Sequence, residues 1–270
     1  MDTNFHTHTT RCNHAYGKER EYVERAIESG LKILGFSDHT PYIFPKGYYS
    51  NFRMRPNEID SYVDTVLDLK REYARDIEIR LGLEVEYYPA YFDRLLDFLE
   101  PYPIEYMLLG QHFVGNEIGM HYCGAETKDP EILKQYCRQS IEGLKTGKFF
   151  YFAHPDLIYF TGDEKLYRSE MRKMCEEIKE LDIPIEVNLL GIAGKRNYPK
   201  ESFWQIAGKV GNRVVIGADA HDPARVYQEK EIRAAELLIK AYGLKYEPDY
   251  GKKGIGADEA GCVKDQRRYA

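Results

Sequence analysis

The chain has 270 residues, 43% of them hydrophobic, and a formal net charge of -6. This composition is sufficient to bury a large core. A mildly acidic chain without a basic stripe is not typical of proteins that bind long nucleic acids. The sequence has no apolar run long enough to span a membrane and no signal-peptide pattern at Met1. We therefore expect a globular protein with no membrane partner and no long nucleic acid as a partner.

The cysteines are odd in number, scattered along the chain, and form no CxxC pair. They are Cys12, Cys123, Cys137, Cys175 and Cys262. Such a pattern does not indicate a disulfide framework and fits a reducing compartment, so we expect a cytoplasmic protein. No motif defines an oligomeric state.

Short apolar strands alternate with amphipathic helices along the first half of the chain. Strands are predicted at 3–8, 32–37, 77–85 and 106–110, and helices at 19–29, 56–74 and 90–99. In the helix at 56–74, for example, Ile59, Val63 and Val66 fall on one stripe. The segment 41–55 is rich in Tyr, Pro and Gly, and we expect a loop there.

The same alternation continues through the second half. Helices are predicted at 129–144, 164–181, 200–210 and 222–242, and strands at 149–153, 183–190 and 213–218. Asp129-Pro130 and Asp222-Pro223 each combine an N-cap residue with proline at the first helical position. These pairs mark the starts of two of the helices.

The alternation amounts to seven strand–helix units, which imply a parallel α/β sheet. Seven units close more easily into a barrel than they lie flat, although an open doubly wound sheet remains the alternative. No linker divides the chain. We therefore expect one barrel domain over 1–247, followed by a polar tail over 248–270 that has little to pack against.

The first predicted strand carries His6 and His8, one residue apart. Because strand side chains alternate with period two, both imidazoles point the same way. Two imidazoles on one face can bind a divalent cation. Taken alone, the pair is explained equally well as part of an alternating polar face of a strand beside a tight turn.

Other chemically active side chains fall at or just beyond the ends of the predicted strands. These residues are His6, His8, His39, Glu84, His112, His154, Asp219 and His221. In a parallel barrel such strand ends meet on one face, where active sites are found. Any one of these histidines could be a core residue whose hydrogen bonds are made within the protein. That explanation is poor for six of the eight histidines, because they lie at equivalent positions in the predicted units. Histidines with carboxylates suit Zn²⁺, Mn²⁺ or Fe²⁺, and the set is large enough for two or three ions.

These motifs resemble those of the PHP superfamily (polymerase and histidinol phosphatase). Within that superfamily, the chain is most similar to the histidinol-phosphatase branch. The matching pieces are His6-Thr-His8, Cys12-Asn-His14, Ser37-Asp-His39-Thr-Pro41, Gly82-Leu-Glu84-Val-Glu86-Tyr87, His112-Phe113, His154-Pro155, Glu186-Val-Asn188 and Asp219-Ala-His221. They follow the family's order over residues 6 to 221. The resemblance implies a distorted (β/α)7 barrel with its metal site at the carboxyl ends of the strands.

The resemblance also implies a site with three ions. The first would be held by His6, His8, Glu84 and Asp219, the second by Glu84, His112 and His154, and the third by His14, His39 and His221.

The residues around such a site have candidate roles as well. Asp38, Asp156 and Glu186 are candidates to orient ligand imidazoles, with ordinary strand-end hydrogen bonding as an equal alternative. Arg196, in a loop ending in Tyr-Pro, and Arg53 are candidates to clamp a phosphate, and Asn188 is a further candidate contact. His121 is expected to be structural or to face solvent.

Together these observations lead to the hypothesis that the chain hydrolyses a small phosphate monoester. A hydroxide bridging two ions would attack phosphorus in line, without a covalent enzyme intermediate. The catalytic set would be His6, His8, Glu84, Asp219 and Arg196. The resemblance implies L-histidinol phosphate as substrate, in histidine biosynthesis. Three alternatives remain: a phosphodiesterase or exonuclease, a metal-dependent amidohydrolase, and a non-catalytic metal-binding module.

Overall fold

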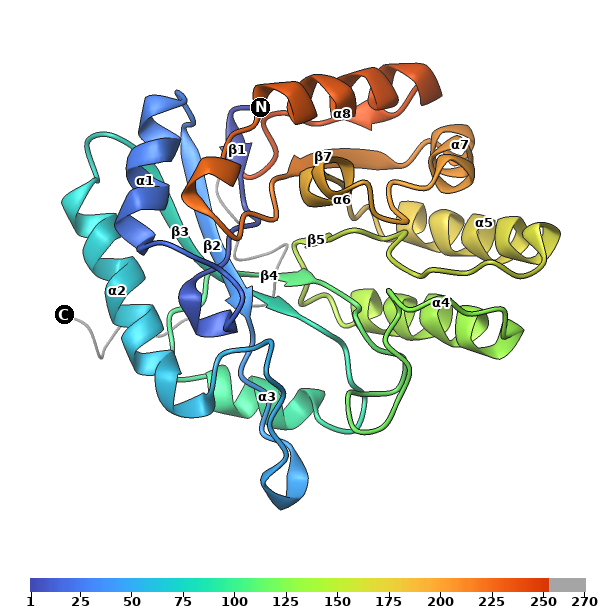
Figure 1. Ribbon diagram of the computed structural model, residues 1–270, viewed down its shortest axis with the longest axis horizontal. Coiled ribbons are helices and arrows are strands. Elements are labelled where there is room, and N and C mark those ends of the chain that lie inside the picture. The colour runs from blue at the N-terminus through green and yellow to red at the C-terminus, as the bar shows by residue number, and fades with distance from the viewer. Residues whose placement is uncertain (253–270) are drawn as a thin grey trace.

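The computed structural model describes residues 1–252. Eight parallel strands form one curled sheet in chain order, and helices surround it (Figure 1). The strands are β1 (Thr3–Asn4), β2 (Ile33–His39), β3 (Glu78–Val85), β4 (Tyr106–Leu109), β5 (Tyr151–Phe152), β6 (Ile185–Asn188), β7 (Arg213–Gly217) and β8 (Lys245–Tyr246).

The helices lie outside the sheet, each with an apolar face toward it. They are α1 (Glu19–Glu28), α2 (Ile59–Glu72), α3 (Phe92–Leu99), α4 (Pro130–Lys145), α5 (Glu164–Glu180), α6 (Leu189–Gly194), α7 (Glu201–Val210) and α8 (Glu229–Tyr242). Short 3-10 turns lie at Thr10–Cys12, Pro45–Gly47, Pro56–Glu58 and Pro223–Arg225. Within residues 1–252, no helix has the length and apolar character needed to cross a bilayer.

The sheet closes on itself at the carboxyl end of its strands. There the backbone N of His8 donates to the carbonyl of Ala220 (2.9 Å), and the backbone N of Ala220 donates to that of His6 (3.2 Å). Lower in the same seam, Oδ1 of the buried Asn4 accepts from the backbone N of Ala218 (3.1 Å). At the opposite end β8 pairs with β7 instead. The expected distorted parallel barrel is confirmed, and the open sheet is not what the chain forms.

Tyr106 fills the lower part of the barrel. Its hydroxyl donates to the carbonyl of Phe5 (2.8 Å) or of Phe36 (3.0 Å). Glycines make room for the ring, since a Cβ at Gly82 would lie 2.3 Å from it and one at Gly35 would lie 2.2 Å from its hydroxyl. The interior below the site is therefore packed.

Four details differ from the expectations. Asp222-Pro223 starts a 3-10 turn, and the helix predicted from residue 222 begins only at Glu229. The first strand is shorter than 3–8, so His6 and His8 lie just beyond β1. The strand predicted at 183–190 ends at Asn188, because its Oδ1 accepts from the backbone N of Gly191 (2.9 Å) and starts α6. The two-residue β8 gives no periodic signal and was not expected.

The start of the predicted tail is packed. Tyr250 stacks on Phe150 with ring centroids 4.5 Å apart, and its hydroxyl donates to the carbonyl of Phe150 (2.9 Å). Nζ of Lys252 donates to Oδ2 of Asp2 (2.9 Å). The expectation of a loose tail from residue 248 is therefore wrong for residues 248–252. The rest of that tail, with Cys262, lies outside the described residues.

Candidate metal centre

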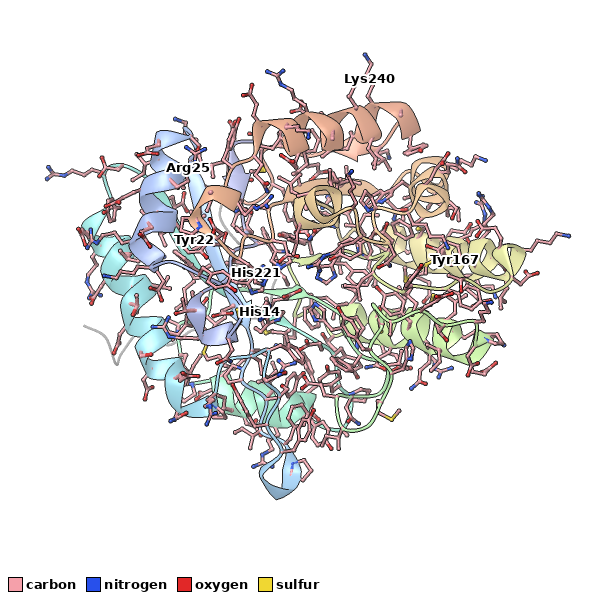
Figure 2. The ribbon with its side chains drawn as sticks, in the orientation of Figure 1. His14, Tyr22, Arg25, Tyr167, His221 and Lys240 are labelled. Atoms are coloured by element: carbon pink, nitrogen blue, oxygen red, sulfur yellow. The ribbon has the colours of Figure 1, made fainter. Side chains whose placement is uncertain are left out.

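A cavity of about 440 Å³ opens at the carboxyl ends of the strands. Figure 2 shows His14 and His221 side by side near the centre of the molecule, whereas Lys240 points outward from α8. One part of the lining is a group of predicted ligands: His14, His39, Glu84, His112, His154, Asp219 and His221. The rest consists of Phe52, Phe113, Tyr122, Leu157, Leu190, Arg196 and Tyr198. His6 and His8 lie completely buried beneath it.

Glu84, on β3, lies at the centre of this group. Its carboxylate oxygens lie 2.8 Å from Nε2 of His154 and 3.0 Å from Nδ1 of His39. They lie 3.6 Å from Nε2 of both His6 and His112. Burial opposes ionisation, but these imidazoles, with His112 foremost, hold the pKa of Glu84 well below its usual value. A single carboxylate therefore faces imidazoles from four segments of the chain.

Asp219 supplies the second carboxylate from the segment after β7. Its Oδ1 lies 3.1 Å from Nε2 of His8 and 3.6 Å from Nε2 of His6. Its backbone is left-handed, with φ of 50°, and that of His154 has φ of 30°. Such conformations are costly for residues other than glycine and cluster at functional sites. The backbone is therefore strained at two of the predicted ligands, Asp219 and His154.

Carboxylates lie behind three of the imidazoles. Oε1 of Glu186 lies 2.8 Å from Nδ1 of His6, a contact that matches the role expected for Glu186. Oδ1 of Asp38 lies 3.4 Å from Nδ1 of His8 but accepts its hydrogen bond from the backbone N of His39 (2.8 Å). A third pair, Glu86 with His112, was not expected; its Oε1–Nδ1 distance is 2.8 Å. The signal was available, since Glu86 follows Glu84 on the same strand with one residue between them.

Asp156 has a different role from the one expected. Its Oδ2 accepts from the backbone N of Lys200 (2.6 Å) and from Nε1 of Trp204 (2.9 Å). Both partners belong to the start of α7. Asp156 therefore anchors a helix and does not orient an imidazole.

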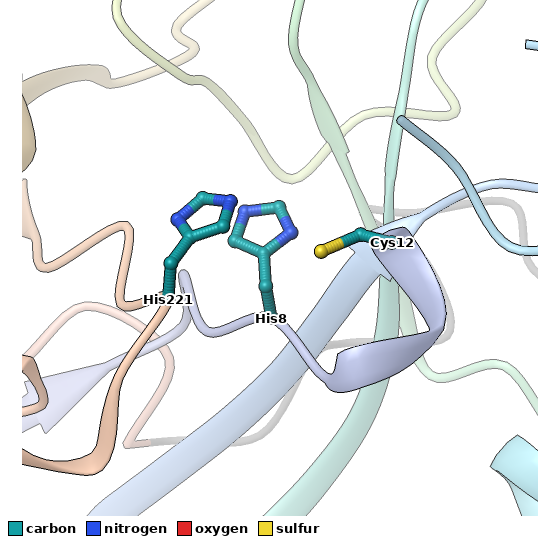
Figure 3. Close-up of side chains that lie close together, drawn as sticks. All are labelled: His8, Cys12 and His221. Carbon is teal, nitrogen blue, oxygen red and sulfur yellow. The ribbon is translucent and has the colours of Figure 1, made fainter. Parts of the chain in front are cut away.

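The third predicted group lies at the rim of the cavity. The ring centroids of His14 and His221 are 4.5 Å apart, and those of His14 and His39 are 5.4 Å apart. Nδ1 of His14 lies 2.7 Å from the carbonyl oxygen of Cys12, which leaves Nε2 free to bind. Figure 3 shows the Cys12 sulfur directed toward the ring of His8, with the ring of His221 beside it.

The donor set fits divalent metal ions. Ligand atoms of His6, His8 and Asp219, and likewise those of His14, His39 and His221, lie within 4.8 Å of one another. So do those of His6, Glu84 and His154. Nε2 of His6 and Nε2 of His221 are buried without a hydrogen-bond partner in the described part of the chain. Buried nitrogens of this kind need a partner, and a cation among carboxylates supplies one.

Arg196 faces the metal-ligand group from the loop after α6. It lines the cavity, and its Nη1 donates to the hydroxyl of Tyr198 (3.0 Å). Its guanidinium carbon lies 5.9 Å from the centre of the Tyr198 ring. The guanidinium is therefore held at the wall of the cavity.

Asn188 does not line the cavity. Its Nδ2 donates to Oε2 of Glu186 (2.9 Å) and to Oδ2 of Asp219 (3.1 Å). The predicted contact with phosphate is therefore not supported. Instead, Asn188 fixes two carboxylates of the site and caps α6.

Arg53 does not line the cavity either, which contradicts the prediction that it reaches the phosphate. It is 1% exposed. Its guanidinium donates to Ser50, to the carbonyl of Thr40 and to Glu117. Each of its three nitrogens already has a protein partner. His121 is half-buried and outside the cavity lining, and its carbonyl accepts from the backbone N of Val114 (3.1 Å).

The family model for the PHP domain matches residues 4–189 of this chain. The matched segment covers more than half of the sequence and includes β2 to β6. The chain belongs to the PHP domain family.

Several proteins that are similar to this chain are named histidinol-phosphatase. A Deinococcus radiodurans protein named "Probable histidinol-phosphatase" is 27% identical over 82% of this chain and 86% of its own length. A Schizosaccharomyces pombe protein of the same name is 23% identical over 84% and 82%. The structure of histidinol phosphate phosphatase from Lactococcus lactis, complexed with zinc, L-histidinol and phosphate, matches with a TM-score of 0.71 and 19% identity, covering 91% of this chain and 95% of that chain. This structural match shows that the fold is shared.

Proposed function

We propose that this chain is a metal-dependent phosphomonoesterase that hydrolyses L-histidinol phosphate to L-histidinol and phosphate. The proposal is carried by one observation: Arg196 faces the group of histidines and carboxylates across a single cavity. A cation opposite a metal centre provides two positive sides for a phosphate. The names of the relatives support L-histidinol phosphate as the substrate and histidine biosynthesis as its pathway.

We assign two or three ions, of Zn²⁺, Mn²⁺ or Fe²⁺, to this centre. The first is assigned to His6, His8, Glu84 and Asp219, and the third to His14, His39 and His221. The second is assigned to Glu84, His112 and His154, because Nε2 of His112 lies 3.6 Å and Nε2 of His154 lies 2.8 Å from Glu84. Divalent ions held there would supply Lewis-acid activation of water and would neutralise charge on the phosphoryl oxygens. His6 and His8, assigned to the first ion, are completely buried, whereas His14, His39 and His221, assigned to the third, line the cavity.

The protein's own part in the reaction is to hold the substrate and to stabilise charge. Arg196 binds phosphoryl oxygens, and the hydroxyl of Tyr198 keeps its guanidinium aimed at the cavity. Glu186 and Glu86 keep His6 and His112 in one tautomer and one orientation. These contacts exist before substrate arrives, so little reorganisation is needed during the reaction.

An aromatic wall receives the leaving group. The rings of Phe52 and Phe113 are stacked with centroids 5.7 Å apart, and Tyr122 lies 5.3 Å from Phe113. Flat apolar surfaces suit a planar ring. The imidazole of L-histidinol is such a ring, which supports this substrate over an aliphatic phosphate.

The test is turnover of a panel of phosphate esters by protein of known metal content. We expect a strong preference for L-histidinol phosphate over glycerol phosphate, phenyl phosphate and the diester bis-p-nitrophenyl phosphate. Chelation should abolish turnover, and Mn²⁺ or Zn²⁺ should restore it. A preference for the diester or for nucleotides would contradict the proposed substrate.

Two variants test the residues. His6→Ala combined with His8→Ala should lower activity at least a hundredfold, about 3 kcal/mol in the barrier. Arg196→Met should raise KM and lower kcat, while Arg233→Met, on the exposed face of α8, should change neither. Full activity in the double histidine variant would rule out the proposed metal centre.

A further inference from the structure

We propose that Arg53 is a positioning residue of the second metal site: it holds the carboxylate of Glu86, which orients His112. The inference rests on the proposed metal centre and assigns to it a residue that touches neither metal nor substrate. It stands on three sets of contacts made by one buried guanidinium.

The first set concerns the burial of Arg53. Its side chain is 1% exposed, and Nε donates to Oγ of Ser50 (2.9 Å) while Nη1 donates to the carbonyl of Thr40 (2.7 Å). Thr40 follows directly on His39, the last residue of β2. A buried charge must be paired, because leaving it unpaired is strongly destabilising. The guanidinium is therefore fixed against the end of β2.

The second set joins the guanidinium to a predicted ligand. Oε1 of Glu86 lies 3.1 Å from Nη2 of Arg53 and 2.8 Å from Nδ1 of His112. One oxygen atom thus links the cation to the imidazole. With the His112 proton on Nδ1, its Nε2 presents a lone pair to the site, 3.6 Å from Glu84.

Glu86 is completely buried, so its carboxylate needs partners within the protein. Arg53 and His112 both contact the same oxygen, Oε1. Without the guanidinium, the carboxylate would lose the cation that holds it beside His112.

The third set of contacts joins Arg53 to the segment after β4. Nη2 of Arg53 also donates to Glu117, whose Oε1 accepts from the hydroxyl of Tyr88 (3.2 Å). His112 and Glu117 belong to the same segment between β4 and α4. Arg53 therefore fixes this segment at two points, directly through Glu117 and indirectly through Glu86.

Phe52, which precedes Arg53 in the sequence and lines the cavity, links the guanidinium to the cavity wall. The guanidinium lies 4.6 Å over the ring of Phe52. That ring lies edge-on to His39 at 5.6 Å and to His112 at 6.4 Å. The aromatic wall and the second metal site thus share one support.

The test measures metal affinity, independently of turnover. Arg53→Met should weaken one ion by about 10–100-fold in a calorimetric titration with Zn²⁺ or Mn²⁺, while the other ions keep their affinity. Arg53→Lys, which keeps the charge, should recover part of the loss and is available if the methionine variant does not fold. Arg80→Met is the matched control, since Arg80 pairs with Glu78 and Glu105 at the opposite end of β3 and should leave every affinity unchanged.

A double-mutant cycle tests the path through Glu86. Glu86→Gln alone should weaken the same ion, and adding Arg53→Met should cost less than the sum of the two single losses. Additive losses, or wild-type affinities in Arg53→Met with only a lower melting temperature, would overturn the inference. Wild-type protein that binds no divalent ion would instead overturn the proposed function.

Discussion

Oε1 of Glu186 lies 2.8 Å from Nδ1 of His6, although the two residues are 180 positions apart in the chain. The same carboxylate accepts from the hydroxyl of Tyr151 (3.1 Å) and, through Oε2, from the backbone N of His154 (3.1 Å). Glu186 therefore contacts two neighbouring predicted ligands, whose ring centroids lie 5.8 Å apart.

Glu186→Gln should weaken the first ion by about 10–100-fold, because the amide keeps the shape but loses the charge that makes His6 a strong ligand. Competition with a chromogenic chelator measures the change. Glu180→Gln, at the exposed end of α5, is the control and should match the wild type. An unaltered affinity in Glu186→Gln would show that the contact is only structural.

Loading the metal-free protein with Zn²⁺ near pH 7 should release at least one proton. Burial lowers the pKa of His8, but Asp219 and Asp38 outweigh it and raise the pKa to about 9. His8 is therefore protonated before the metal arrives, and a ligand imidazole must be neutral. Titration calorimetry in buffers of different ionisation enthalpy measures the released protons. Heats that do not depend on the buffer would contradict this expectation.

Asp156→Asn should alter how stability depends on pH. Burial raises the pKa of Asp156 to about 7 from 3.8, despite the opposing hydrogen bonds from Lys200 and Trp204. The folded state thus binds this proton more tightly than the unfolded chain, so the stability from the protonated group is complete at low pH and is lost as pH rises toward 7.

Between about pH 4 and about pH 7, the wild type should therefore lose up to about 4 kcal/mol of unfolding free energy relative to the asparagine variant. Urea denaturation of both proteins across this range, in the metal-free state, checks the difference. Parallel pH profiles would mean that Asp156 stays ionised in the fold.

Cys12→Ser should leave the metal content unchanged. The group formed by His8, Cys12 and His221 is close enough to hold an ion, but burial raises the pKa of the Cys12 thiol far above its usual value. The contact that orients His14 comes from the Cys12 carbonyl, which serine retains. Cobalt-loaded wild type should then show no thiolate-to-metal charge-transfer band. A band that Cys12→Ser lacks would place Cys12 among the ligands.

Much of the centre is readable from the sequence because parallel strands bring their carboxyl ends together. His39 and Glu84 stand at the same height, paired in register between β2 and β3. Their meeting follows from strand ends alone. The same reasoning identifies Asp219 and His221 from their position just beyond β7.

Side chains that act behind the ligands are harder to predict, because their partners depend on tertiary packing. Asp156 and Glu186 look alike in sequence, each near a strand end, yet one anchors α7 and the other orients His6. Arg53 looked like a phosphate clamp because loops of this kind open on the metal face. Only the fold shows that Glu86 and Glu117 hold it inside.

The ion pair between Asp2 and Lys252 joins residues 250 positions apart at the foot of the barrel. The catalytic mouth lies at the other end of the strands, so a peptide joining residues 2 and 252 would not approach it. A circular permutant with new ends in the loop between α4 and β5 should therefore fold and keep its metal content. Equally, tethering the protein to a surface near Lys252 would leave the cavity facing the solution.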